Sequence, residues 1–242
     1  MNVEFSRISG GGVLLIVPAY NEAGTIEYVV SNLKDKGVDF VVVNDGATDE
    51  TPSILERIGA PHINLIENLG IGGAVQAGYR YALQAGYDIA IQFDGDGQHD
   101  TAFIDKLVDA LRRQGADIAV GSRFVGNESE FKSSIFRRMG IRFLSLVLYF
   151  ASGVQVKDVT SGFRAVNRRT IKLFADTYPS DYPEPESLSF AAARGLKIVE
   201  VPVAMHERMG GSSSISGLKS LWYMVKVGLS ILLAGSLKRR GR

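Results

Sequence analysis

The sequence has no cysteine, which excludes disulfide bonds and metal sites built from thiolates. It also has no long apolar run: the uncharged stretch at 227–237 is too short to span a bilayer, which takes about 20 residues. The apolar run at 13–17 is too short for a signal peptide and lacks a basic flank. We therefore expect a cytoplasmic protein.

The sequence has almost no excess charge of either sign. Its 27 basic and 26 acidic residues leave a net charge of +1 at pH 7, which gives no reason to expect a nucleic-acid partner. With 242 residues, 45% of them hydrophobic, the chain is long enough for one substantial α/β domain. We place this domain at residues 1–212, followed by an amphipathic, basic helix within residues 213–242.

Short apolar runs typical of buried strands alternate with helical segments through the first half of the chain. We expect strands at 13–17, 40–43, 63–66, 88–93 and 118–120, and helices at 23–36, 51–58, 72–85 and 101–114. This alternation predicts an open, mostly parallel sheet with helices on both faces, which binds ligands beyond the carboxyl ends of its strands. Polar clusters follow several of these ends and indicate a nucleotide-like ligand with a metal on its phosphates. They lie at 18–22, 44–49, 68–73 and 94–98.

Two carboxylates, Asp94 and Asp96, follow the strand expected at 88–93. In extended backbone, side chains two residues apart point the same way, so the pair can converge on one hard cation such as Mg²⁺ or Mn²⁺. Gly95 would let the backbone approach a bulky ligand closely. Asp-Gly is also a common hairpin turn, and Asp100 or Thr101 can cap the following helix. The segment does not fit a calcium-binding EF-hand loop, and the pair alone does not decide between a turn and a metal site.

Other nucleotide chemistries are weakly supported. The glycines at 70–73 follow the third expected strand without G-x-G-x-x-G spacing, and the sequence has no G-x-x-x-x-G-K-[ST] motif. Dinucleotide-dependent oxidoreductases and P-loop NTPases are therefore poor matches. A sugar nucleotidyltransferase is also disfavoured, because the sequence has no glycine-rich amino-terminal loop followed by Arg and Lys.

Several motifs together resemble the family 2 glycosyltransferases of the GT-A fold, over about residues 12–210. They are Val-Pro-Ala-Tyr-Asn-Glu at 17–22, Asn-Asp-Gly-Ala-Thr-Asp-Glu-Thr at 44–51, Asn-Leu-Gly at 68–70 and Phe-Asp-Gly-Asp-Gly-Gln at 93–98. Gly-Ser-Arg-Phe at 121–124 and Ser-Gly-Phe-Arg at 161–164, with Asp158 just upstream, resemble the branch of dolichyl- and polyprenyl-phosphate hexose synthases.

The resemblance implies a donor site for a nucleotide sugar and a metal site. The metal, Mg²⁺ or Mn²⁺, would be bound by Asp94, Asp96 and Gln98, with Asp96 also counted as catalytic. Arg164 would lie near the phosphates of donor and acceptor and is also expected to be a catalytic residue. The donor would contact residues from several motifs, including a late loop of Arg and serines that can close over its phosphates. These residues are Pro18, Tyr20, Glu22, Asp45, Gly70, Asp94, Gly95, Arg123 and Arg208.

The sequence departs from the family pattern where a general base is expected. The acidic segment at 181–186 does not match the usual acidic motif, and either Glu184 or Glu186 could deprotonate a sugar hydroxyl. A phosphate acceptor is already anionic and needs no base. The alternative is that Pro183 and Pro185 shape a turn and that the acids only start a helix near Glu186.

Two segments combine apolar residues with clustered cations. The first segment is 131–151, and the second is the tail, which is apolar over 218–237 and basic over 238–242. Each could lie in a membrane interface or pack as an ordinary helix. The tail could also dock on a membrane partner. His206 could ligate a metal, although simple hydrogen bonding is the more common role for a lone histidine.

Together these features predict an inverting, metal-dependent glycosyltransferase. It would move a hexose from a nucleotide sugar to polyprenyl phosphate as a peripheral protein on the inner face of the cell membrane. A peripheral transferase that adds sugar to a polysaccharide hydroxyl is one alternative. A non-catalytic nucleotide-sugar-binding subunit of a membrane complex is the other.

Overall fold

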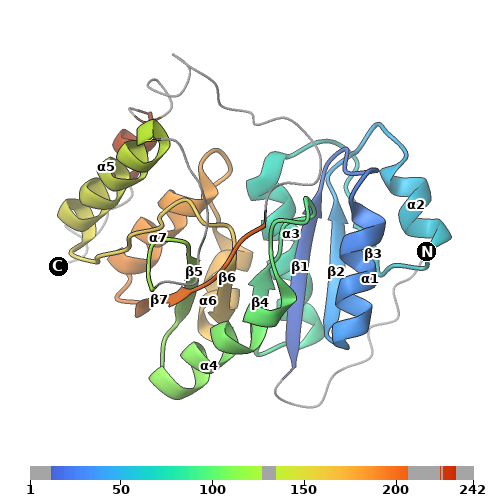
Figure 1. Cartoon of the computed structure of the whole chain (residues 1–242), viewed down its shortest axis with the longest axis horizontal. Helices are drawn as coiled ribbons and strands as arrows, with labels where there is room; N and C mark the ends of the chain where they lie inside the picture. Colours follow the sequence, from blue (N-terminus) through green and yellow to red (C-terminus); the bar gives the residue numbers. More distant parts are fainter. Residues whose placement is uncertain (1–11, 127–134, 207–223, 225, 233–242) are drawn as a thin grey trace.

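The computed structural model describes residues 12–126, 135–206, 224 and 226–232. Its centre is a seven-stranded sheet with the order β3-β2-β1-β4-β6-β5-β7 (Figure 1). The strands are β1 (Val13–Ala19), β2 (Asp39–Asn44), β3 (His62–Asn64), β4 (Ile89–Gln92), β5 (Ile118–Ser122), β6 (Arg164–Asn167) and β7 (Ile198–Pro202).

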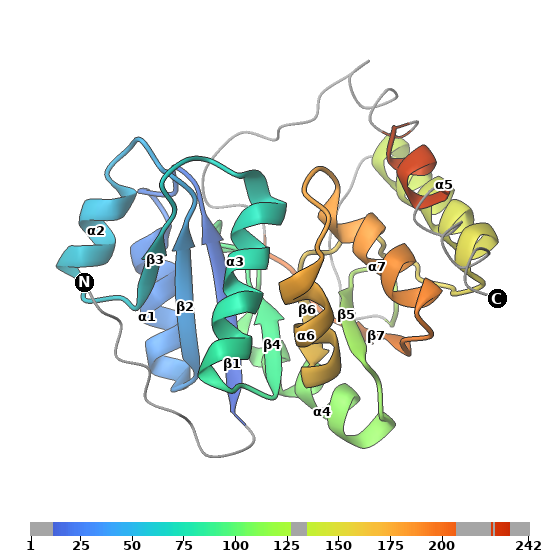
Figure 2. The ribbon, with the colours of Figure 1, turned by 180° about the vertical axis from the view of Figure 1, so that it is seen from behind.

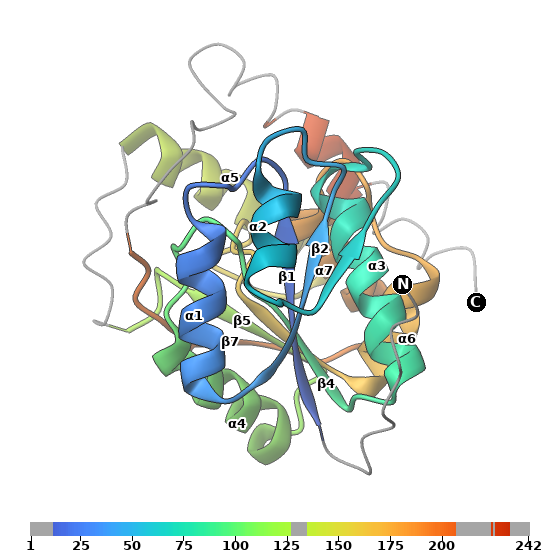
Figure 3. The same cartoon turned by 90° about the vertical axis from the view of Figure 1, so that its right-hand side faces the viewer.

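Helices connect most of these strands and cover both faces of the sheet (Figures 2 and 3). They are α1 (Ile26–Lys36), α2 (Thr51–Arg57), α3 (Gly70–Ala85), the 3₁₀ turn η1 (Thr101–Phe103), α4 (Ile104–Gln114), α5 (Ile135–Ser152), α6 (Arg168–Asp176) and α7 (Pro183–Ala193). The predicted mostly parallel α/β sheet is therefore confirmed.

Strand β1 shows how the sequence pattern builds two cores. Its side chains alternate between the two faces of the sheet, as the period of two of a strand requires. Leu14 and Ile16 join the core beneath α3, α5, α6 and α7, whereas Leu15 and Val17 join the core beneath α1 and α4. Because both faces are covered, the strand reads as a continuous apolar run rather than as an alternating one.

Strand β1 pairs in parallel with β2 and with β4, so their carboxyl ends meet at one edge of the sheet. The strand passes through Pro18 to Ala19, two residues beyond the predicted end. Proline fits here because its fixed φ suits extended backbone, and the Ala19 carbonyl accepts a 2.9 Å hydrogen bond from the Asp45 N–H. This contact holds the ends of β1 and β2 together.

The sheet is not parallel throughout. Strand β6 runs antiparallel to β4 and to β5. This arrangement places the Arg164 end of β6 beside the Gln92 end of β4, in register Gln92↔Arg164. The residues just before β6 and just after β4 therefore meet at the edge where β1 and β2 also end.

Helix α5 and the terminal segment 226–232 pack side by side over α7. The Ser189 hydroxyl of α7 donates to the Ile231 carbonyl at 2.9 Å, and Val227 and Ile231 are fully buried. Of the predicted C-terminal helix, residues 213–223, 225 and 233–242 lie outside the described residues. Within the described residues, no helix is both long enough and apolar enough to cross a membrane.

Candidate active site

The loops after β1 and β2 are fastened together by Asn21. The Asn21 side-chain oxygen accepts hydrogen bonds from the N–H of Thr48 at 2.8 Å and of Asp49 at 3.3 Å. Asn21 has a φ of 56°, in the left-handed region that few non-glycine residues adopt. The Glu22 N–H in turn donates to the Thr51 hydroxyl at 2.9 Å. These bonds fix one wall of the expected donor site.

Asp45 forms a second part of this edge. It is 3% exposed, and its carboxylate accepts a 2.8 Å hydrogen bond from the Leu69 N–H, just before α3. Burial raises the pKa of the Asp45 carboxyl, and the N–H groups of Leu69 and Gly70 oppose the shift. Gly46 is required here, because a Cβ on it would lie 2.9 Å from the Asn68 nitrogen and its φ is +65°.

The carboxylates Asp94 and Asp96 follow β4, which ends at Gln92. Asp94 lies two residues beyond the strand and Asp96 lies in the turn that follows, so neither belongs to β4. Asp96 is 4% exposed and accepts a 3.0 Å hydrogen bond from the Gln98 N–H. The Asp94 side chain keeps 30% exposure. The predicted helix cap is also present, since Asp100 accepts a hydrogen bond from the Ala102 N–H.

His99 supports Asp94, a role that the sequence analysis missed. Its Nδ1 accepts the Asp94 N–H at 2.9 Å, and its Nε2 lies 3.5 Å from the Asp94 carboxylate. The ring stacks on Phe163 at 4.6 Å and meets the edge of Phe93. Burial lowers the pKa of His99, against the opposite effect of the nearby aspartates, and therefore favours the neutral ring whose Nδ1 can accept.

Glu184, at the start of α7, lies beside Asp94. Burial raises its pKa, with Asp94 adding to the rise and Arg164 and Gln92 opposing it. The Gln92 amide also donates to the Asp94 carboxylate at 3.2 Å, so Gln92 contacts both acids. Gly162 closes the cluster: a Cβ on it would lie 3.0 Å from Asp94 Oδ2 and 2.8 Å from Gln92 Nε2.

Glu186 points elsewhere. It hydrogen-bonds the Ser230 side chain of the terminal segment, and burial raises its pKa. Helix α7 begins at Pro183, three residues earlier than expected. The structure therefore separates the two acids that the sequence analysis treated as equivalent, and only Glu184 is near Asp94.

The two arginines expected near phosphates are held by the protein. Arg123 forms a two-point ion pair with Asp158, with both nitrogen–oxygen distances at 2.7 Å and side-chain exposures of 6% and 0%. The Glu200 carboxylate accepts the Asp158 N–H at 2.9 Å. Arg164 is 3% exposed and donates to the carbonyls of residues 159, 161 and 184 and to the Ser187 hydroxyl.

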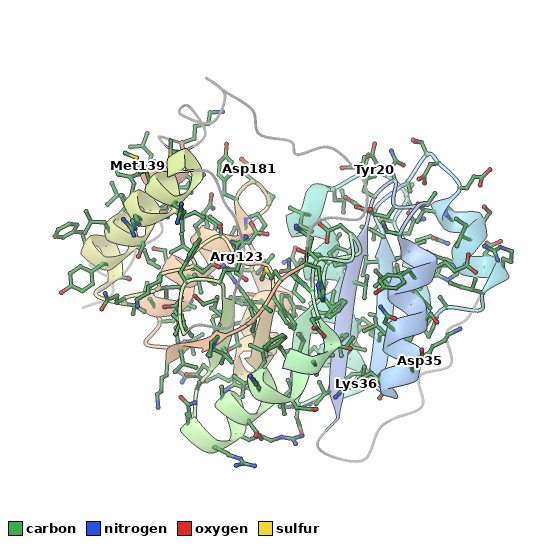
Figure 4. The ribbon with its side chains drawn as sticks, in the orientation of Figure 1. Tyr20, Asp35, Lys36, Arg123, Met139 and Asp181 are labelled. Carbon is green, nitrogen blue, oxygen red and sulfur yellow. The ribbon has the colours of Figure 1, made fainter. Side chains whose placement is uncertain are left out.

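The other predicted donor contacts lie around the same edge. Tyr20 is 47% exposed. Figure 4 shows Tyr20 and Asp181 at the upper edge of the molecule, and Asp35 and Lys36 at the opposite end. Pro18 is buried in β1, and its carbonyl would lie 3.1 Å from a Cβ on Gly95. Gly70 begins α3, and Arg208 lies outside the described residues.

His206 contacts the loop that carries the aspartates. Its N–H donates to the Gln98 carbonyl at 2.9 Å, and its ring lies 3.4 Å from the Asp100 carboxylate. Among the described residues, no group of three or more His, Asp or Glu side chains is arranged to hold a metal ion. The residues expected to bind a metal, Asp94, Asp96 and Gln98, lie together in the segment that follows β4.

The acidic loops lie at the carboxyl ends of parallel strands, which is where open α/β sheets bind their ligands. Residues 14–174 match the model of glycosyl transferase family 2. The chain therefore belongs to this family and is a glycosyltransferase, as its motifs indicate.

Several relatives are named as transferases of sugars to lipid phosphates. The undecaprenyl-phosphate mannosyltransferase of Micrococcus luteus is 33% identical over 215 residues, covering 85% of this chain and 88% of that protein. The UDP-N-acetylglucosamine–dolichyl-phosphate N-acetylglucosaminyltransferase of Methanococcus voltae is 31% identical over 212 residues, covering 79% and 84%. The resemblance to the polyprenyl-phosphate branch is confirmed at this level.

A solved structure supports the fold. Glucosyl-3-phosphoglycerate synthase from Mycobacterium tuberculosis, crystallised with Mn²⁺, UDP and glucosyl-3-phosphoglycerate, matches with a TM-score of 0.69 at 23% identity, covering 93% of this chain and 80% of that chain. At this identity the match speaks for the fold alone, which confirms the predicted GT-A architecture.

Proposed function

We propose that this glycosyltransferase moves a hexose from a nucleotide sugar to polyprenyl phosphate, with inversion at the anomeric carbon, at the cytosolic face of the membrane. The observation that carries the proposal is the placement of Asp45 and of the Asp94–Asp96 pair after β2 and β4, the two neighbours of β1. Relatives that are about one-third identical over most of the chain, and that act on undecaprenyl and dolichyl phosphate, support the acceptor class.

In this proposal the two fastened loops bind the nucleotide. Pro18, Tyr20 and Glu22 lie against base and ribose, with Asp45 on the base or ribose edge and Gly70 and Gly95 allowing close approach. Asn21, by fixing the loops to each other, orders this wall before the donor arrives. Arg208, on the late loop, would meet the donor phosphates.

Asp94 and Asp96, with Gln98, would hold Mg²⁺ or Mn²⁺, which offsets the charge that the nucleoside diphosphate gains as it leaves. The chain fits such an ion because the pair offers hard oxygen ligands and because His99, Gln92 and the turn N–H groups orient them. The Mn²⁺ in the structural neighbour supports a divalent ion of this kind.

The acceptor phosphate is already anionic, so it attacks without a general base. In this proposal Arg123 and Arg164 border the acceptor phosphate on the side of the site formed by residues 158–164. Asp158 pairs with Arg123 at both carboxylate oxygens and so fixes the orientation of its guanidinium.

Glu184 supports a second candidate, transfer to a sugar hydroxyl. This acid lies beside Asp94, and its raised pKa suits a general base that must take a proton. If the acceptor is a hydroxyl, Glu184→Gln should abolish transfer while Glu186→Gln, on the side of Ser230, retains it. If the acceptor is a phosphate, both variants should keep transfer within a few-fold.

The test of the main proposal is transfer from a panel of radiolabelled nucleotide sugars to undecaprenyl phosphate with Mg²⁺ or Mn²⁺. We expect metal-dependent, chloroform-extractable label that disappears in Asp96→Asn. Asp109→Asn, which changes an exposed carboxylate on α4, is the matched control and should behave as wild type. Donor binding without any lipid product would contradict the lipid-phosphate acceptor.

A further inference from the structure

Helix α5 has apolar side chains on both sides. Its inner side buries Ile141, Leu144 and Leu148 against the core. Its outer side leaves five large apolar side chains between 48% and 75% exposed. They are Met139, Phe143, Leu146, Tyr149 and Phe150. The spacing of three and four residues along 139, 143, 146 and 150 places these side chains on one face of the helix.

The terminal segment 226–232 enlarges this face. Leu229 and Leu232 are 56% and 48% exposed, although Val227 and Ile231 of the same segment are buried. A Cβ on Gly228 would lie 3.6 Å from the Phe143 ring, so the segment runs directly beside α5. We call the seven exposed side chains of α5 and this segment the apolar face.

The apolar face is a concentration and not a random scatter. Twelve large hydrophobic side chains are exposed in the described part of the chain, and seven of them belong to this face. Figure 4 shows one of them, Met139, at the outer side of α5, away from the sheet. A contiguous exposed apolar patch of this kind marks an interaction surface.

The charges on the same helices indicate what covers the face. Arg138, Arg142 and Lys226 are exposed, and neither α5 nor residues 226–232 contain an acidic residue. A second copy of the chain would bring these cations against one another, which opposes self-association. An anionic lipid surface instead matches both features, with apolar side chains entering the acyl boundary and cations at the headgroups.

We propose that the apolar face seats the protein on an anionic bilayer without crossing it. This inference rests on the proposed lipid-phosphate acceptor and adds the orientation. The face is carried by helices that pack on α7, through Ser189 to Ile231 and Glu186 to Ser230. Helix α7 therefore connects the apolar face to the site, because it also carries Glu184 beside Asp94.

The test measures sedimentation with vesicles of phosphatidylglycerol and phosphatidylcholine, and with vesicles of phosphatidylcholine alone. The wild type should bind the anionic vesicles. The triple variant Phe143→Ser, Leu146→Ser, Phe150→Ser should lose more than tenfold in partitioning, because it removes apolar area that enters the lipid. Tyr28→Ser, at a side chain on α1 that is 50% exposed, is the control and should bind as wild type.

A charge-matched pair of variants tests the headgroup contact. Arg138→Gln with Arg142→Gln should weaken binding to the anionic vesicles by about fivefold for each charge removed. Arg112→Gln with Arg113→Gln removes two exposed charges from α4 and should leave binding unchanged. Equal binding of the two double variants would overturn the proposed orientation.

Other outcomes separate the inference from the proposed function. The membrane assignment would be overturned if the wild type did not bind vesicles. It would also be overturned if the wild type were a dimer and the triple variant a monomer. Transfer to a short-chain, water-soluble polyprenyl phosphate needs no bilayer, so the triple variant should keep it. If the wild type binds vesicles but transfers no sugar to this acceptor, the proposed function is wrong, and the membrane contact of the apolar face is still supported.

Discussion

The Asp94 N–H donates to Nδ1 of His99 at 2.9 Å, and Nε2 of the same ring lies 3.5 Å from the Asp94 carboxylate. One buried ring thus holds both the backbone and the side chain of Asp94. His99 is therefore a positioning residue for the acid that we assign to the metal and the donor.

Replacing His99 with Phe should keep the stacking on Phe163 and leave the Asp94 N–H without its acceptor. We expect a loss of about 1–3 kcal/mol in the free energy of unfolding, measured with urea. We also expect weaker Mn²⁺ binding in the presence of UDP, because the carboxylate is no longer oriented. His99→Asn, which can restore an acceptor, should recover part of both. Unchanged Mn²⁺ affinity in His99→Phe would contradict the positioning role.

Gly162 is required by closeness to Asp94 and not by a left-handed backbone, since its Cβ would lie 3.0 Å from the carboxylate. Gly162→Ala should therefore displace Asp94 and reduce metal-dependent transfer at least tenfold, with a smaller effect on stability. Gly24→Ala is the matched control, because a Cβ there meets nothing within 4 Å. Steady-state transfer rates across a Mn²⁺ titration would reveal the effect. Equal activity of the two variants would show that the site tolerates the added methyl group.

These two residues show where sequence reasoning stops. The strands β1, β2 and β4 were predictable because each is a continuous apolar run, and Asp94, Asp96 and Asp45 followed from their places after those runs. The Asp100 cap was predictable because capping is local. His99 and Gly162 could not be recognised as supports, since their roles depend on contacts with Phe163 and Asp94 that only the folded sheet creates.

Strands β6 and β7 were not predicted from the sequence, although the strand at 118–120 was. Strand β6 has only four residues and runs antiparallel, so the strand–helix alternation of the sequence does not predict it. The preference for Glu184 over Glu186 likewise required the structure, because it depends on which side of α7 faces the aspartates and which faces Ser230.

Glu184 should make stability depend on pH. Because its pKa in the folded state is raised above the ordinary 4.5, the folded protein binds more protons than the unfolded chain from about that pH upward. The free energy of unfolding should therefore fall as pH rises from 4.5 through the raised pKa. Urea unfolding without divalent cations should show that Glu184→Gln removes this part of the slope. An exposed control, Glu56→Gln, should keep it, and an equal slope in Glu184→Gln would refute the argument.

The buried ion pair of Arg123 and Asp158 should be far more sensitive than a surface pair. Asp158→Asn leaves a nearly buried guanidinium without its counter-charge, which costs about 3–5 kcal/mol in comparable cases. Glu27→Gln breaks the exposed pair with Arg57, which should cost far less because solvent screens the two charges. Urea denaturation of the two variants compares these costs directly. Similar losses would mean that solvent reaches the Arg123 pair.

The most direct test of the central claim is the structure of the product. The enzyme would be supplied with a nucleotide sugar, Mn²⁺ and a short-chain polyprenyl phosphate, and the product examined by proton and phosphorus NMR. The account predicts a sugar whose anomeric proton couples to the lipid phosphorus, with the anomeric configuration opposite to that of the donor. A retained configuration, or sugar attached to an oxygen other than the phosphate, would contradict it.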